Sequence, residues 1–163
     1  MEFYHINRFL FDVGTIIRPG AWGRPILSGM TYSGLRPNVN YFILFREYVF
    51  EQIRQELYPN KPSRLKGTFI CPNYLSAKNF WSIERQMGEI IYKVELLEDK
   101  PFHVADLNFT SPPQTPESLY YSIPKAAISY WGYPQKEDYT NPSDNLLEAI
   151  TESAIRISEI VQP

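Results

Sequence analysis

The chain has 163 residues, a length typical of one domain, with 44% hydrophobic residues, 15% aromatic residues and a formal net charge of −2, which argues against a large nucleic-acid-binding surface. Cys71 is the single cysteine, so an internal disulfide and a zinc site with two or more thiolates are excluded. The N-terminus lacks a basic segment followed by an apolar one, and no run of about 18 apolar residues occurs, so we expect a cytoplasmic protein without membrane contact.

The first third of the chain is irregular. A short strand is expected at Phe3–Asn7 and another at Thr15–Ile17, while Gly and Pro make residues 29–40 a loop. Residues 41–58 are the clearest helix, which Pro59 ends. Its apolar residues recur at helical spacing, which predicts that they form the buried face: Phe42, Phe45, Val49, Ile53 and Leu57.

The remaining two thirds predict mainly strands. Helices are expected from Ala77 to about Met87, with Ser76 as N-cap, and over Glu117–Trp131, which Pro124 interrupts. Strands are expected at residues 67–71, 89–97, 102–109, 146–151 and 155–161. The final segment, LLEAITESAIRISEIV, also fits helical spacing. This order predicts an α+β sandwich of two small sheets with helices packed outside, as a single domain over residues 1–163.

Three short segments hold residues that could carry chemistry. The first strand contains Tyr4-His5 followed by Ile6. The strand from Gly67 to Cys71, which includes Phe69, precedes a Ser/Ala-containing helix start that ends at Phe80-Trp81. Near the C-terminus, Glu148 lies in the expected strand at 146–151, which an alternating strand follows.

Each segment also has a purely structural interpretation. His5 would then be a hydrogen-bonded histidine in a half-buried strand, and Phe80 and Trp81 would be core residues on a helix face. Glu148 would be a surface carboxylate on a terminal helix.

In this order, the three segments resemble the ADP-ribosyltransferase superfamily, particularly its diphtheria-toxin and poly(ADP-ribose) polymerase branch. The resemblance implies a split β-sandwich that uses NAD as substrate, with Glu148 on the penultimate strand as the catalytic carboxylate. It implies that His5 binds the adenosine ribose hydroxyl and that the backbone of Ile6 holds the nicotinamide carboxamide. Phe80, or Trp81 after a shift of one residue, would stack on the nicotinamide ring.

The chain departs from the family pattern at two of these positions. Ile6 stands where the family usually has glycine, although only its N–H and C=O are needed. Phe80 stands where the family often has tyrosine, and it keeps the stacking face.

Arg64, in the segment Pro62-Ser63-Arg64, is a further candidate. Its planar guanidinium suits a pyrophosphate, so we expect it to reach a phosphate of NAD; the alternative is a solvated loop charge. No metal is expected, because His5 and His103 lie in separate strands without ligand-spaced partners.

The expected activity is cleavage of the nicotinamide–ribose bond and transfer of ADP-ribose to a protein or nucleic acid. The size is compatible with a toxin of a toxin–antitoxin or anti-phage system, whose antitoxin would be a partner. Two alternatives stay open: a catalytically weak or inactive NAD-binding module of the same fold, and a non-enzymatic interaction domain.

Overall fold

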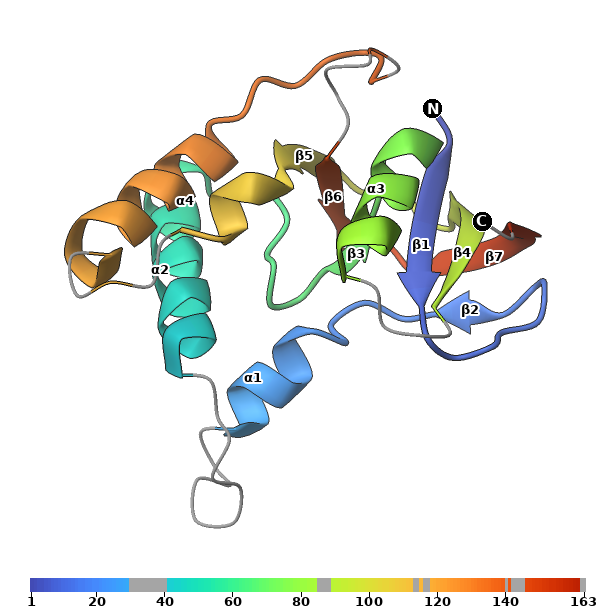
Figure 1. The fold of residues 1–163 in the computed structure, drawn as a ribbon, viewed down its shortest axis with the longest axis horizontal. Coiled ribbons are helices and arrows are strands. Elements are labelled where there is room, and N and C mark those ends of the chain that lie inside the picture. Colours follow the sequence, from blue (N-terminus) through green and yellow to red (C-terminus); the bar gives the residue numbers. More distant parts are fainter. Residues whose placement is uncertain are drawn as a thin grey trace.

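The described part of the computed structural model comprises residues 1–29, 41–84, 89–112, 115, 118–139, 141 and 146–161. Its strands form two antiparallel sheets, a four-stranded sheet in the order β1-β4-β7-β2 and a three-stranded sheet in the order β3-β6-β5 (Figure 1). The strands are β1 (Phe3–Asn7), β2 (Ile16–Ile17), β3 (Thr68–Ile70), β4 (Ile90–Leu96), β5 (Phe102–Asp106), β6 (Leu147–Thr151) and β7 (Ile155–Val161). The expectation of an α+β protein with two small sheets is therefore confirmed.

Helices cover the outer faces of the two sheets. The helices are α1 (Gly23–Gly29), α2 (Tyr41–Leu57), α3 (Tyr74–Glu84) and α4 (Ile123–Trp131). α2 and α4 lie side by side next to the three-stranded sheet, whereas α3 lies against β1 (Figure 1). A 3-10 turn at Leu107–Thr110 and a π-helical turn at Ser118–Ser122 lead into α4.

Side-chain alternation along the strands divides the core into separate clusters. The central cluster lies between the two sheets and contains Tyr92, Val104, Ala149 and Ile157. On the opposite face of the three-stranded sheet, a second cluster packs Phe50 of α2 and Trp131 of α4 against Ile150 of β6. A third, smaller cluster lies under α3. Residues of β6 thus face either the sandwich interior or the helix pair α2 and α4.

The predicted elements agree with the structure except at several points. The expected strand at 102–109 ends at Asp106, because Leu107–Thr110 forms a 3-10 turn, and the helix α1 was not expected. The C-terminal segment forms the strand pair β6 and β7, so the helical alternative for Glu148 is wrong. α3 begins at Tyr74 rather than Ala77, because Asn73 Oδ1 accepts the Ser76 N–H at 2.7 Å and caps the helix in place of Ser76. Most of the expected loop at 29–40, and the last expected helical residues at 85–87, lie outside the described residues.

Candidate functional site

The two sheets meet at one point and then separate. Tyr4 of β1 and Cys71, just after β3, exchange both backbone hydrogen bonds, at 2.9 and 2.7 Å. A continued antiparallel ladder would next join Ile6 to Phe69. Instead, Phe69 O lies 2.9 Å from His5 Nδ1, so the histidine side chain takes the place of the Ile6 N–H. We call this opening the β1–β3 split.

The backbone of Ile6 faces the split. Because Tyr4 directs its N–H and C=O towards β3, alternation directs the same groups of Ile6 to that side, away from β4. The side chain of Ile6 packs instead into the cluster under α3. Ile6 therefore offers one backbone donor and one backbone acceptor to the split, and its side chain does not fill the split.

His5 is held as a neutral imidazole. Since a carbonyl oxygen can only accept, Nδ1 carries the proton that it donates to Phe69 O. Nε2 lies 3.3 Å from Asn7 Nδ2 and accepts from it. Burial lowers the pKa of His5, and the hydrogen bond to the Phe69 carbonyl opposes this shift only in part.

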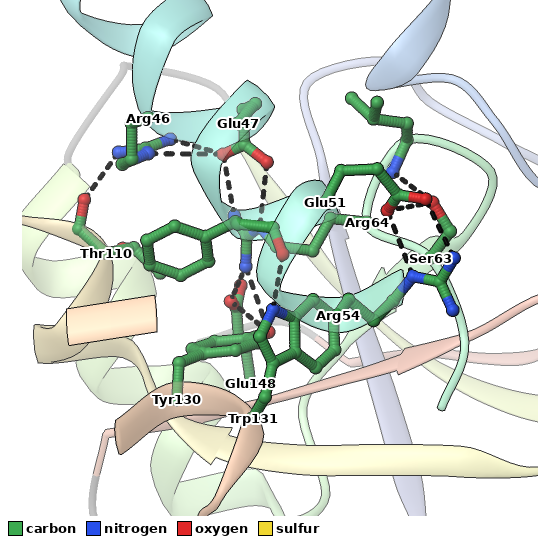
Figure 2. A network of polar contacts seen from close by, with 12 residues as sticks. Arg46, Glu47, Glu51, Arg54, Ser63, Arg64, Thr110, Tyr130, Trp131 and Glu148 are labelled. Atoms are coloured by element: carbon green, nitrogen blue, oxygen red, sulfur yellow. Dashed lines mark hydrogen bonds and ion pairs between the residues drawn. The ribbon is translucent and has the colours of Figure 1, made fainter. Parts of the chain in front are cut away.

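Glu148 lies on the face of β6 that meets the helix pair. Its Oε1 accepts the Tyr130 hydroxyl at 2.7 Å and forms an ion pair with Arg64 Nη1 (Figure 2). Within the described residues, Oε2 accepts no hydrogen bond, and 11% of the side chain stays exposed. The carboxylate is thus oriented through one oxygen while the other stays available.

Arg64 joins Glu148 to a second carboxylate, Glu47 of α2. Its Nε and Nη2 donate to the two oxygens of Glu47, at 2.9 and 3.2 Å. Burial by itself would lower the pKa of Arg64, but the carboxylates of Glu148 and Glu47 hold it well above its ordinary value. Arg64 is therefore neither a solvated loop charge nor a group that projects freely towards a phosphate.

Glu47 is more enclosed than Glu148. It is fully buried, and Arg46 forms a second ion pair with it at 2.7 Å. Burial would raise the pKa of Glu47, yet the charges of Arg64 and Arg46 lower it below its ordinary value. With both oxygens bonded, Glu47 serves to hold Arg64 in place.

Because of these ion pairs, α2 buries some residues other than those that apolar spacing predicted. The helix buries Glu47, Phe50 and Glu51, whereas Phe45 and Leu57, expected in the core, are 38% and 55% exposed. Phe42, Val49 and Ile53 are partly buried, as expected. Apolar spacing misjudged the face because a carboxylate can be buried when a cation pairs with it.

Phe69 connects the split to the ion network. Its ring lies 4.8 Å from the Arg64 guanidinium carbon, an arrangement that favours cation–π attraction. Trp22 packs edge-on against the same ring at 6.2 Å, and its buried Nε1 has no partner within the described residues. A continuous series of contacts therefore runs from His5 through Phe69 and Arg64 to Glu148.

The other predicted aromatics lie on α3. Trp81 packs against the cluster that contains Tyr4 and Ile91, and its Nε1 donates to the Glu89 carbonyl at 3.1 Å. Phe80 is partly exposed on the same helix. Trp81 therefore packs as a core residue, which was one of its two predicted roles. Phe80 stays the better candidate for the ring that would stack on a ligand.

Sequence reasoning missed Glu47, Tyr130 and Trp22. Glu47 was taken for the polar side of a helix, and Tyr130 is one of 12 tyrosines without a local motif. No signal in the sequence marks Trp22.

Two antiparallel sheets with helices on their outer faces define an α+β protein. A family model described as "Protein of unknown function (DUF2441)" matches residues 28–163, and the chain belongs to this family. The match includes Arg64, Phe80 and Glu148 and begins after β1, so it leaves His5 outside. No curated protein matches the chain.

Two further observations concern the described residues alone. None of their helices is long and apolar enough to cross a membrane. Among them, no three His, Cys, Asp or Glu side chains are grouped so as to hold a metal ion.

Proposed function

We propose that the protein is an NAD-dependent ADP-ribosyltransferase that cleaves the nicotinamide–ribose bond and transfers ADP-ribose to a macromolecular acceptor. The observation that most favours this function is the series of contacts from His5 to Glu148, which links the first strand to the penultimate strand across the β1–β3 split. These are the two strands on which the resemblance expects the histidine and the catalytic glutamate.

The hydrogen bonding of Glu148 suits cleavage of the nicotinamide–ribose bond. Breaking the nicotinamide–ribose bond develops positive charge at C1′ and the ring oxygen of the ribose, as in glycoside hydrolysis. A carboxylate fixed beside the ribose stabilises this charge and can accept a hydrogen bond from the 2′-hydroxyl. Arg64 and Tyr130 hold Oε1, which leaves Oε2 for the substrate.

The ion-pair network around Glu148 is neutral as a whole. Arg46 and Arg64 balance Glu47 and Glu148, so the substrate would meet the local negative charge of Oε2 and not a net charge of the network. Fixed partners also reduce the reorganisation needed when charge develops on the substrate.

The β1–β3 split offers groups for the nicotinamide half of NAD. The N–H and C=O of Ile6 match the acceptor and donor of a carboxamide. Phe80 would supply the stacking face, and His5 Nε2 could accept a ribose hydroxyl after displacing the longer contact to Asn7. Positioning matters because an error of about 1 Å can cost on the order of 100-fold in rate.

The proposed acceptor is a protein or nucleic acid. The cellular role we propose is that of a toxin in a toxin–antitoxin or anti-phage system, with an antitoxin as partner.

A second candidate is an NAD-binding module without turnover. The ion pair between Arg64 and Glu148 favours it, because a carboxylate engaged by a cation is a weaker electrostatic partner for a cationic transition state.

One experiment separates the two candidates. The purified protein is incubated with NAD, free nicotinamide is measured, and mass spectrometry of a cell lysate treated with labelled NAD identifies the acceptor. An enzyme releases nicotinamide. A binding module releases none but is stabilised by NAD, by about 2.7 kcal/mol at 100 times the dissociation constant. If millimolar NAD gives no nicotinamide release and no thermal shift, both candidates are contradicted.

A further inference from the structure

A pocket of about 330 Å³ lies beyond the C-terminal half of α2, at the end of β6 opposite to Glu148. It is formed by Arg54 of α2, by the segment that follows α2, and by residues just before β5 and just after β6. Its lining residues are Arg54, Pro59, Asn60, Lys61, Pro62, Lys66, Lys100, Pro101 and Glu152. None of them belongs to the β1–β3 split.

The charge of the pocket differs from that of the whole chain. Its lining holds four cations, two of which pair with carboxylates: Arg54 with Glu51 at 2.8 Å and Lys100 with Glu98 at 3.0 Å. Together with Glu152, the four cations and three carboxylates leave a net charge of +1, although the chain as a whole carries −2.

Two lysines make this charge available to a ligand. Within the described residues, neither Lys61 nor Lys66 has a carboxylate partner. Lys61 Nζ donates to the Trp131 carbonyl and lies 5.0 Å from the centre of the Tyr58 ring, so its position is restrained. Burial lowers the pKa of Lys61 with no opposing negative charge, and such an ammonium is stabilised when an anion binds.

Three prolines restrict the backbone of the pocket. Pro59, Pro62 and Pro101 have their φ angles fixed by the pyrrolidine ring. Glu152 Oε1 also accepts the Ser63 N–H at 2.9 Å, which ties the turn after β6 to the segment after α2. A preformed pocket loses less conformational entropy when a ligand binds.

We propose that this pocket binds a phosphorylated small molecule of about mononucleotide size, with its phosphate group between Lys61 and Lys66. The volume lies at the lower end of the range of about 300–1,000 Å³ that is common for small-molecule sites. Lysine ammonium groups are frequent phosphate ligands that act as point charges. The site is separate from the proposed NAD site, and the inference does not depend on that function.

Isothermal titration calorimetry at low ionic strength tests this site with inorganic phosphate, ribose 5-phosphate, AMP and uncharged adenosine. We expect AMP and ribose 5-phosphate to bind, adenosine not to bind, and the variants Lys61→Met and Lys66→Met each to weaken binding by at least ~10-fold. Lys125→Met, which removes an exposed charge from α4, serves as the matched control and should bind as wild type does. Binding of inorganic phosphate as strong as that of AMP would contradict the proposed mononucleotide-sized ligand, because the anion alone would then be recognised.

The His5→Ala variant distinguishes this pocket from the proposed NAD site. It should leave binding of AMP and ribose 5-phosphate unchanged. The inference is overturned if no phosphorylated probe binds, if both lysine variants bind as wild type does, or if His5→Ala alone abolishes binding.

Discussion

Arg64 Nη1 and Glu148 Oε1 form an ion pair on the helix-facing side of β6, where 5% of the arginine side chain and 11% of the glutamate side chain are exposed. The same guanidinium holds the fully buried Glu47 through two donors. The two glutamates therefore share one cation, and only Glu148 keeps an oxygen without a protein partner within the described residues. This asymmetry allows the structural and catalytic roles of the network to be separated.

Glu148→Gln should keep the fold and the affinity for NAD while slowing nicotinamide release by at least ~100-fold, about 2.7 kcal/mol of transition-state stabilisation. The matched control is Glu47→Gln, which changes the other partner of Arg64 and should affect stability more than rate. Nicotinamide release and NAD affinity are measured for both variants. A Glu148→Gln protein with wild-type turnover would exclude the catalytic role of this carboxylate.

His5→Ala should raise the KM for NAD more than it lowers kcat, because the proposed role of His5 is to bind ribose and not to transfer a proton. Asn7→Ala is the matched control, since it removes the longer partner of Nε2, together with an exposed bond from the Phe9 N–H, and leaves the bond between His5 and Phe69. Steady-state kinetics with NAD distinguish the two parameters. Slower turnover at an unchanged KM would contradict the ribose-binding role.

Arg64→Met should destabilise the protein by about 3–5 kcal/mol, because it leaves Glu148 buried without a counter-charge and Glu47 with Arg46 alone. Arg156→Met is the control: that arginine pairs with Glu95 on the surface, where 50% and 54% of the two side chains are exposed, and we expect a cost of no more than about 1 kcal/mol. Urea unfolding gives both values. Equal free energies of unfolding for wild type and Arg64→Met would show that the network does not stabilise the fold.

The stability should fall as the pH drops from about 6.5 to 4. His103 is 1% exposed, its ring stacks on Trp131 at 5.2 Å, and its Nε2 donates to the Tyr130 carbonyl. Burial lowers the pKa of His103 to about 4, so in this pH window the unfolded chain binds a proton that the folded protein does not. The loss can reach about 3 kcal/mol, and the lowered pKa of His5 acts in the same direction.

His103→Phe tests the origin of this slope. The variant keeps an aromatic ring against Trp131 and removes the titrating group, so its free energy of unfolding should depend less on pH between 4 and 6.5. Urea unfolding at several pH values measures the slope for both proteins. An unchanged slope in His103→Phe would assign the pH dependence to other groups.

Local patterns in the sequence predicted most of the elements. Five elements lie close to their expected bounds: β1, β4, β6, β7 and α2. In these elements the spacing of apolar residues within the segment was enough to indicate a strand or a helix. The start of α3 was missed because Ser76 and Asn73 are both acceptable N-caps, and the choice depends on where the preceding strand ends.

The sequence by itself determined the α+β class and the strand that carries His5, whereas it left both a strand and a helix open for Glu148. Only the tertiary structure decided what surrounds these residues: Arg64 lies 17 positions from Glu47, 66 from Tyr130 and 84 from Glu148. The identity of a neighbour at such separations depends on how sheets and helices pack, which no local pattern encodes. For the same reason α2 buries Glu47 and exposes Phe45. A buried charge is tolerated only when folding brings its partner, and that partner is supplied by another part of the chain.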